Sequence, residues 1–515
     1  MLRAHGAEAV REAERPLLEA GEPLMLRAAA ALAERAVHHL RSAPFAPQVL
    51  VLAGAGSNGG DGLHAAAILR REHSLDADAI TTAPRRHEEG AAALEAAGGT
   101  LHPLASLDEE RLGHLLSGAD LVIDAILGIG GRPEVPAALV PLLTAVRDSG
   151  VPVLAADLPS FVDATTGQAA PEALPARETV TFGAVKAGLL LPGGAELAGT
   201  VHLVDLGLEE HLPARAAVER LEDADVRALL PRPGRDSTKY RRGVVALAVG
   251  SEQYPGAAVL AVSGAARTGA GMVRCLAPQA VLDLVLRARP ETVGHPVGPG
   301  RAGGRVLDDE TLARTHAVVI GPGLPSDDPR VRRGVALLAG QMDVPAEAPR
   351  RGVLDAGALG SIDPGVRFGP DVVLTPHRGE AERLARRLDI DPDLPAPELA
   401  RALAAATGAT VLLKGAITLV APGDGGPLRS QDDATPQLAT AGTGDVLAGV
   451  LGALLAAGLP GPDAAALAAL LHGRAGRLAS RDGLHSLVAL DVADSLPEAI
   501  GTILADAQDL NRGAR

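Results

Sequence analysis

One glycine-rich turn in the second half of the chain has the residues best suited to chemistry. Ala441-Gly442-Thr443-Gly444-Asp445 leads directly into an apolar helical segment. Backbone N–H groups at a helix start bind anions, and glycines let a phosphate approach the backbone closely. A carboxylate repels that phosphate unless it acts as a base or holds a cation, which makes Asp445 a candidate base. The alternative is that Asp445 only caps the helix.

Three more turns in the second half follow short apolar segments. They are Gly321-Pro322-Gly323, Thr375–Glu380 and Lys414–Thr418. Open α/β sheets bind ligands at the carboxyl ends of their strands. We therefore expect the four turns to meet in one crevice.

The first half contains a second candidate phosphate site at Gly54–Gly62, between an apolar strand and a helix. The turn lacks the Gly-Lys-Ser/Thr ending of a P-loop, and a dinucleotide fingerprint is the competing interpretation. Asn58 and Asp61 are oxygen donors that such a fingerprint does not require. Oxygen donors indicate a hard cation.

Further polar residues follow strands in the first half, namely Asp124, Asp157 and Ser160. Each alone is typical of a turn or a helix cap, but together they indicate a cation and sugar site. Lys186 is either solvated or placed in the site, and its apolar neighbours Val185 and Leu189 favour a placed amine.

Strands and helices alternate along both halves, which predicts α/β folds with right-handed crossovers and parallel sheets. The first half, with a helical stretch over roughly Ala7–Leu40, is predicted to be a Rossmann-like doubly wound domain. Its predicted strands are 49–53, 121–123, 151–155, 179–182 and 201–204. The predicted strands of the second half are 244–249, 272–276, 317–320, 353–354, 372–374 and 411–413, before final helices at 445–457 and 463–479.

Residues 209–239 are charged, contain prolines and lack a periodic strand, so we place a domain boundary near residue 220. The predicted domains are 1–220 and 221–515. A chain of 515 residues exceeds the size of one growing hydrophobic core, which agrees with two domains.

Composition excludes several classes of protein. The net charge of −15 argues against a nucleic-acid partner, and the absence of Trp makes aromatic stacking a poor basis for ligand binding. The single cysteine, Cys275, excludes an internal disulfide framework, and we interpret it as a small buried hydrophobe. We find no signal peptide, and the longest apolar run, 446–459, is too short for a membrane span. We expect a cytoplasmic enzyme without a membrane partner.

The second half resembles the ADP-dependent NAD(P)H-hydrate dehydratase family, a branch of the ribokinase-like α/β fold. The motifs that support this are Gly250-Ser251, Gly256-Ala257, Gly321-Pro322-Gly323-Leu324, Leu374-Thr375-Pro376-His377, Lys414-Gly415-Ala416 and Ala441–Gly449. The resemblance implies that Lys414, Gly415, Ala416, Ile417, Thr418, Gly442, Thr443 and Gly444 bind the nucleotide. It also implies that Ala257, Gly323, His377 and Asp445 contact the hydrated nicotinamide. The chain departs from the family at Gly357, where an aspartate is usual, and at Thr238, where we expect a histidine.

The first half resembles the NAD(P)H-hydrate epimerase family over about Ala7–Leu208. The motifs are Asn58–Gly62, Asp124–Gly128, Asp157–Ser160 and Thr179–Gly183. The resemblance implies that the substrate lies among Ser57, Asn58, Gly59, Gly60, Asp61, Gly128, Ile129, Gly130, Gly131, Arg132, Pro133, Glu134 and Asp157. It implies a potassium ion on Asn58, Asp124 and Ser160, and we assign catalysis to Asp157 and Lys186. Ser57 replaces a usual Asn, and Phe161 a usual Gly.

Together these resemblances predict a bifunctional enzyme that returns hydrated NADH and NADPH (NADHX and NADPHX) to the normal cofactors. We expect potassium in the epimerase domain, ADP as co-substrate of the dehydratase with Mg²⁺ as a candidate companion, and a homo-oligomer. One alternative is a ribokinase-like kinase of a small alcohol or vitamin precursor with a non-catalytic dinucleotide-binding first domain. Another is a regulatory dinucleotide sensor.

Overall fold

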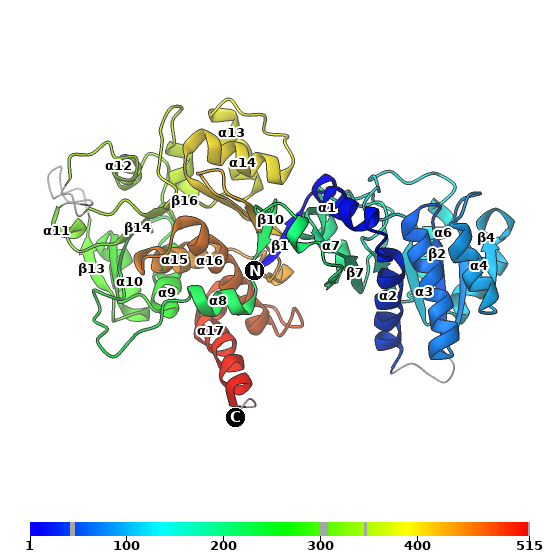
Figure 1. The fold of residues 1–515 in the computed structure, drawn as a ribbon. Helices are drawn as coiled ribbons and strands as arrows, with labels where there is room; N and C mark the ends of the chain where they lie inside the picture. Colours follow the sequence, from blue (N-terminus) through cyan, green and yellow to red (C-terminus); the bar gives the residue numbers. More distant parts are fainter. Residues whose placement is uncertain (42–46, 298–306, 308, 345–347, 513–515) are drawn as a thin grey trace. The chain divides into compact units, whose positions relative to one another are not determined.

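The computed structural model describes residues 1–41, 47–297, 307, 309–344 and 348–512, and Figure 1 follows them along the chain. The chain divides into two compact units, Leu2–Val218 and Glu219–Arg515. Both units are α/β and their strands are mainly parallel, so the fold class predicted from the sequence is confirmed.

The first unit is built on a parallel sheet with the strand order β4-β3-β2-β5-β6-β7-β9. The strands are β2 (Gln48–Ala53), β3 (Asp76–Thr81), β4 (Leu101–Pro103), β5 (Leu121–Ala125), β6 (Val153–Ala156), β7 (Glu178–Phe182) and β9 (Thr200–Val204). Outside this seven-stranded sheet, β1 (Leu2–His5) pairs in parallel with β8 (Val185–Lys186). The strand order reverses at β2 and β5, which makes the sheet doubly wound and creates a crevice at their carboxyl ends.

Helices cover both faces of this sheet. They are α1 (Ala7–Glu19), α2 (Leu24–Leu40), α3 (Ser57–His73), α4 (Glu88–Ala96), α5 (Glu109–Gly118), α6 (Val140–Ser149) and α7 (Gly194–Ala198). Along β2, Val49 and Val51 pack into one hydrophobic cluster with α2 and α3, whereas Leu50 and Leu52 pack into another with α5 and α6. Burial on both faces explains why the strand is a continuous apolar run.

The second unit has the strand order β13-β12-β11-β14-β15-β16-β17-β18-β19. The strands are β11 (Val244–Ala248), β12 (Met272–Ala277), β13 (Val293–Pro296), β14 (Ala317–Ile320), β15 (Gly352–Leu354), β16 (Val372–Leu374), β17 (Thr410–Leu413), β18 (Thr418–Ala421) and β19 (Leu428–Gln431). The sheet is parallel as far as β17, and β18 and β19 then extend it antiparallel. The loops after β11, β14, β15, β16 and β17 therefore leave one edge together.

The helices of the second unit are α8 (Asp223–Leu229), α9 (Gly256–Thr268), α10 (Gln279–Ala288), α11 (Asp309–Leu312), α12 (Pro329–Leu338), α13 (Arg378–Arg387), α14 (Ala396–Thr407), α15 (Thr443–Ala456), α16 (Gly461–Ser480) and α17 (Ala489–Arg512). One hydrophobic cluster joins α9, α15, α16 and α17 to alternate residues of the central strands, such as Val245, Leu247 and Val319. Figure 1 shows these helices close together. Cys275 lies in the same cluster, where burial raises the pKa of its thiol to about 12, so the prediction of a buried small hydrophobe is confirmed.

Glycines allow α9 and α15 to pack backbone against backbone. A Cβ atom on Gly449 would lie 1.9 Å from the carbonyl oxygen of Ala261, and one on Gly264 would lie 2.3 Å from that of Val446. No side chain fits at either position without a shift of a helix. This contact holds α15, and with it the turn that precedes it, against α9.

The structure corrects several sequence-based expectations. The single helical stretch over Ala7–Leu40 is wrong, because Gly21, at φ +80°, and Pro23 separate α1 from α2. Strand β3 was missed because Asp76 and Asp78 interrupt its apolar pattern. The segment 209–239 contains the short strand β10 (Val218–Arg220) and α8, and α17 follows the two predicted final helices. Within the described residues, no helix combines the length and apolar character needed to cross a bilayer.

Candidate active sites

The turn before α15 is held in place from behind. Gly442 has φ +90° and precedes the first helical residue, Thr443. The Thr443 hydroxyl donates to the carbonyl of Leu438 at 2.9 Å, and Nε2 of the buried His472 lies 2.9 Å from the Thr443 carbonyl oxygen. Burial lowers the pKa of His472 to about 4, so its ring is neutral and donates this hydrogen bond at neutral pH. The first N–H groups of α15 are left for a ligand.

Lys414 lies beside this turn at the end of β17. Its Nζ is 3.0 Å from Oδ1 of Asp355 and 3.8 Å from Oε2 of Glu380, and a Cβ atom on Gly444 would lie 3.5 Å from it. The Thr375 hydroxyl donates to the same Asp355 oxygen at 2.8 Å. Burial lowers the pKa of Lys414, but Asp355 and Glu380 outweigh it and hold that pKa above its ordinary value. The ammonium group is therefore charged next to the anion hole.

Asp445 lies in the first turn of α15, within electrostatic range of Asp355 and Lys414. Burial and the Asp355 carboxylate raise the pKa of Asp445 to about 7, although Lys414 opposes them. In the described chain, α15 receives no side-chain cap hydrogen bond. A carboxylate that changes protonation near neutral pH has the affinity for protons that a general base needs.

The other predicted dehydratase residues surround this cluster. A Cβ atom on Gly323 would lie 2.6 Å from Cβ of Ala257, so the loop after β14 touches the start of α9. His377 begins α13, where its Nδ1 accepts from Gly379 N–H at 3.1 Å and its own N–H donates to Glu380 at 2.9 Å. A parallel bridge joins the backbone of His377 to Lys414. Of the remaining nucleotide candidates, Gly415 and Ala416 are exposed in the turn after β17, Ile417 is buried, and the half-buried Thr418 begins β18.

The departure at Gly357 has a steric cause. Gly357 lies in the 3₁₀ helix η4 (Ala356–Ser361), and a Cβ atom there would lie 2.0 Å from the carbonyl oxygen of Leu324. The loop after β14 thus occupies the space that a side chain at this position would need. An aspartate does not fit here unless that loop moves.

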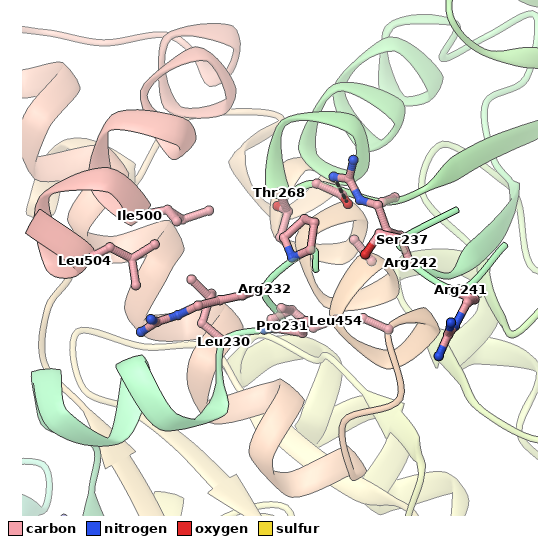
Figure 2. Close-up of a pocket in the computed structure, with 15 residues that line it drawn as sticks. Leu230, Pro231, Arg232, Ser237, Arg241, Arg242, Thr268, Leu454, Ile500 and Leu504 are labelled. Atoms are coloured by element: carbon pink, nitrogen blue, oxygen red, sulfur yellow. Dashed lines mark hydrogen bonds between the residues drawn. The ribbon is translucent and has the colours of Figure 1, made fainter. Parts of the chain in front are cut away.

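A further pocket of the second unit lies at the opposite edge of the sheet from the dehydratase cluster. Arg241 and Arg242 precede β11 and Gly269 and Ala270 precede β12, so this pocket of about 240 Å³ lies at the amino ends of the strands. Figure 2 shows the guanidinium groups of Arg232, Arg241 and Arg242 at separate places around it, and that of Arg242 donates to the Gly269 carbonyl. Thr238 belongs to the same edge, where its hydroxyl accepts from Arg241 N–H.

In the first unit, a buried ion pair forms the centre of the candidate site. Lys186, which is fully buried, donates from Nζ to Asp157, to the carbonyl of Phe182 at 2.8 Å and to the hydroxyl of Thr181 at 3.2 Å. The solvated interpretation of Lys186 is therefore wrong. Asp157 has φ +69°, a strained conformation that turns its side chain toward this amine.

The glycine-rich turns converge on Asp157. Ile129 N–H donates to Oδ2 of Asp157 at 3.1 Å, and a Cβ atom on Gly128 would lie 3.0 Å from that oxygen and 3.1 Å from Oδ1 of Asn58. Both amide atoms of Asn58 are buried without a hydrogen-bond partner among the described residues. Burial and the Asp157 charge raise the pKa of Asp61 well above its ordinary value. A buried amide without a partner indicates a place for a ligand.

Asp124 and Ser160 contact each other directly. Ser160 donates to Asp124 from its hydroxyl at 2.6 Å and from its N–H at 2.9 Å, and burial raises the pKa of Asp124. Phe161 follows with φ +68° and an almost fully buried ring. Burial of the ring in the hydrophobic cluster beneath the site offsets the cost of this backbone conformation, which explains how a bulky residue stands where glycine is usual. Ser57, Arg132 and Glu134 are exposed around the site.

Four residues of these sites were missed by sequence reasoning. Asp355, Glu380 and His472 belong to the dehydratase cluster, and Glu14 of α1 belongs to the epimerase cluster. Burial raises the pKa of Glu14, and both Lys186 and Asp157 act on it electrostatically. Asp355 directly follows the predicted strand 353–354 and Glu380 ends the turn Thr375–Glu380, so the position of both at a strand end could have identified them. Nothing local marks Glu14 or His472.

The chain is similar to known proteins over most of its length. A family model described as NAD(P)H-hydrate dehydratase matches residues 245–498, and a model described as YjeF-related protein N-terminus matches residues 21–188. A protein of Mycobacterium tuberculosis named bifunctional NAD(P)H-hydrate repair enzyme Nnr is 38% identical over 476 residues, which cover 90% of this chain and 92% of the relative. The relative of the same name from Mycobacterium leprae is 37% identical and covers 94% and 95%.

The chain belongs to the bifunctional NAD(P)H-hydrate repair enzyme family.

This family extends to distant bacteria. The Escherichia coli member is 32% identical over 496 residues, which cover 94% of this chain and 90% of that protein. A solved structure of an ADP/ATP-dependent NAD(P)H-hydrate dehydratase from Bacillus subtilis, co-crystallised with ATP and Mg²⁺, is 30% identical. It covers 56% of this chain and 99% of that chain, with a TM-score of 0.48.

Proposed function

We propose that this chain repairs hydrated nicotinamide cofactors. Its first domain, 1–220, interconverts the R and S hydrates at nicotinamide C6. Its second domain, 221–515, uses ADP to convert the S hydrate to NADH or NADPH and releases AMP and phosphate. The main support is the position of Asp445, a carboxylate with a pKa of about 7, between an anion hole and the charged Lys414. Fusion of the two activities is sensible because only one epimer is consumed.

In the dehydratase, Asp445 accepts the proton of the C6 hydroxyl as that oxygen attacks the β-phosphorus of ADP. AMP leaves, and the negative charge on the transferred phosphoryl group is stabilised by the N–H groups of Gly442–Gly444 and by Lys414. The C6–O bond then breaks with its electron pair on phosphate, the C5 proton passes to solvent, and the electron pair of the C5–H bond forms the ring double bond. Gly415–Thr418 bind the nucleotide, and Ala257, Gly323 and His377 contact the hydrated ring.

In the epimerase, Asp157 and Lys186 perform catalysis on a substrate held by Ser57–Asp61 and Gly128–Glu134. The burial of the ion pair and its contact with the Gly128 turn support this assignment. Loss and return of the C6 hydroxyl require a group that gives a proton and a group that takes one. The buried ion pair provides both kinds of group in one place.

Potassium binds at Asn58, Asp124 and Ser160 in this proposal. The residues fit a monovalent cation, because all three offer oxygen, Asp124 is a buried carboxyl group and the Asn58 amide has no hydrogen-bond partner among the described residues. Replacing potassium by a bulky organic cation is expected to lower the rate of epimerisation. Full activity without any metal ion would contradict this assignment.

Magnesium is proposed to bind together with the nucleotide. Among the described residues, no group of three or more His, Cys, Asp or Glu side chains could hold a metal ion, so the phosphates of the nucleotide are its proposed ligands. A homo-oligomer and a cytoplasmic location stay predictions, which light scattering and cell fractionation test.

A single assay tests the function. Hydrated NADH, as a mixture of epimers, is incubated with the protein and ADP, and the absorbance of the reduced nicotinamide is followed while AMP is measured. The proposal expects both epimers to be consumed with one AMP formed for each NADH. Binding of the hydrate without turnover would instead indicate a dinucleotide sensor and overturn the proposal.

A further inference from the structure

A second cavity in the second unit opens beside the dehydratase cluster. It has a volume of about 500 Å³ and lies between the loop after β14, the 3₁₀ helix η4 and helix α13. The loop after β14 contributes Leu324 and Ser326 to the lining, η4 contributes Gly357, and α13 contributes Glu380 and Arg383. The volume is in the range of ligand cavities, which run from about 300 to about 1,000 Å³.

The cavity lies next to the place proposed for the hydrated ring. Leu324 directly follows Gly323, which contacts Ala257, and Glu380 is bonded to the His377 backbone at 2.9 Å. Glu380 also lies 3.8 Å from Nζ of Lys414. A ligand with its ring at Gly323 and His377 can therefore reach the cavity, because Leu324 and Glu380 of its lining are neighbours of these two residues.

Helix α13 places positive charge on this cavity. Arg387 is already engaged, because it donates to the Gly360 carbonyl at 2.6 Å and pairs with Asp363 at 3.0 Å. The guanidinium group of Arg383, one turn earlier, is exposed and makes no hydrogen bond or ion pair within the described chain. The carboxylate of Glu382 beside it is paired with Arg378 at 2.7 Å. One guanidinium group at the cavity is thus available to an anion.

The carboxylate that lines the cavity does not cancel this charge. Glu380 is committed to the N–H of His377 and to Lys414. Gly357 and Gly360 add backbone without side chains, so their wall carries no charge. The planar guanidinium group can donate two parallel hydrogen bonds to two oxygens of a phosphate group, which makes phosphate a preferred partner.

We propose that this cavity binds the adenylate half of the dinucleotide substrate and that Arg383 contacts a phosphate of that half. The inference depends on the proposed function, because it assumes hydrated NADH or NADPH as the substrate. ADP occupies the other side of the cluster, at the Lys414–Thr418 turn, and leaves this cavity to the dinucleotide. Arg383 thereby determines specificity for a dinucleotide over a mononucleotide.

The test compares Arg383→Gln with Arg386→Gln, a matched control that is exposed on the same helix but does not line the cavity. Steady-state kinetics with ADP use three substrates: hydrated NADPH, hydrated NADH and hydrated reduced nicotinamide mononucleotide, which has no adenylate half. Loss of a hydrogen bond to a charged group corresponds to about a 10-fold effect or more. Arg383→Gln is expected to raise KM for the dinucleotide hydrates by this factor, with kcat within about twofold.

Each outcome decides the matter. A rise in KM for both dinucleotides but not for the mononucleotide supports contact with the adenylate phosphate of the pyrophosphate. A rise in KM for hydrated NADPH alone supports contact with its ribose phosphate. The inference is overturned if the variant has an equal effect on the mononucleotide, if it raises KM for ADP instead, or if it behaves like Arg386→Gln. In these cases turnover by the wild-type protein still supports the proposed function. Absence of wild-type turnover with any hydrate rejects the proposed function itself.

Discussion

At the scale of residues, both candidate sites depend on carboxylates whose surroundings change their affinity for protons. Asp445 has a pKa of about 7 because it is partly buried and lies near Asp355. Asp61 in the first unit has a raised pKa because it is buried near Asp157. Such shifts are typical of groups that give or take protons during a reaction. Two predictions about the dehydratase follow from the charges around Asp445.

The first prediction concerns Asp445→Asn. Asparagine caps a helix about as well as aspartate, so a capping role predicts little change in stability or rate. An amide cannot accept the hydroxyl proton, and general-base catalysis contributes typically ~10²- to 10⁴-fold, so we expect the dehydratase rate to fall by about that factor. ADP affinity, measured by calorimetry, should survive because the glycine N–H groups and Lys414 remain. Near-normal turnover with intact binding would refute Asp445 as the base.

The second prediction concerns the pH dependence of the reaction. A base with a pKa of about 7 is protonated and inactive below that pH, so kcat/KM should rise through pH 7 as the carboxylate forms. The Asp355 charge raises this pKa, and its removal in Asp355→Asn should lower it. We expect the acidic limb of the pH–rate profile to move to lower pH in this variant. If the acidic limb stays in place or moves to higher pH, it does not arise from the ionisation of Asp445 under the influence of Asp355.

At the scale of elements, α9 and α15 determine where the anion hole lies. Their backbones touch at Gly264 and Gly449, and the turn 442–445 is the start of α15. A helix is rigid along its axis, so a displacement at Gly449, about two turns into α15, moves its first N–H groups. The geometry of the site is thus set by a packing contact that takes no part in the chemistry.

We predict that Gly449→Ala damages the dehydratase without touching its ligands. The added Cβ atom would lie 1.9 Å from the Ala261 carbonyl oxygen, so the helices must separate, and overpacking of this kind costs about 1–3 kcal/mol. We expect a lower melting temperature and a loss of ADP-dependent turnover. Gly501→Ala in α17 is the control, because nothing lies within 4 Å of its Cβ atom, and it should leave activity unchanged. If the two variants have the same melting temperature and the same turnover, the contact between α9 and α15 does not position the anion hole.

At the scale of the whole molecule, each candidate site is complete within one compact unit. The residues of the dehydratase cluster lie in Glu219–Arg515, and those of the epimerase cluster lie in Leu2–Val218. Each unit also has its own hydrophobic clusters. A unit with its own core can fold alone.

The prediction at this scale is a division of labour between fragments. A fragment that begins at Leu221 should fold and dehydrate the S hydrate with ADP, while the R hydrate remains largely unused at early times. Chiral chromatography of the remaining hydrate measures this, with the full chain as the control that consumes both epimers. Rapid use of both epimers by the fragment would contradict the assignment of epimerisation to the first domain.

The amino-acid sequence by itself determined the α/β class, most of the strands and the glycine-rich turns that hold the candidate residues. These features are local, because apolar runs, β-branched residues and glycines act on the backbone within a few positions. It missed strands such as β3, in which Asp76 and Asp78 interrupt the apolar pattern, and it joined α1 to α2 across Gly21.

Only the tertiary structure decided which side chains act on one another. Asp355, Glu380 and Lys414 come from three different strand ends, and parallel pairing brings them to one edge of the sheet. Glu14, from the first helix, acts on Lys186 more than 150 residues later, and no local pattern marks that pairing. A pKa near 7 at Asp445 likewise depends on burial and on a neighbouring charge from a distant loop, both of which are properties of packing in three dimensions.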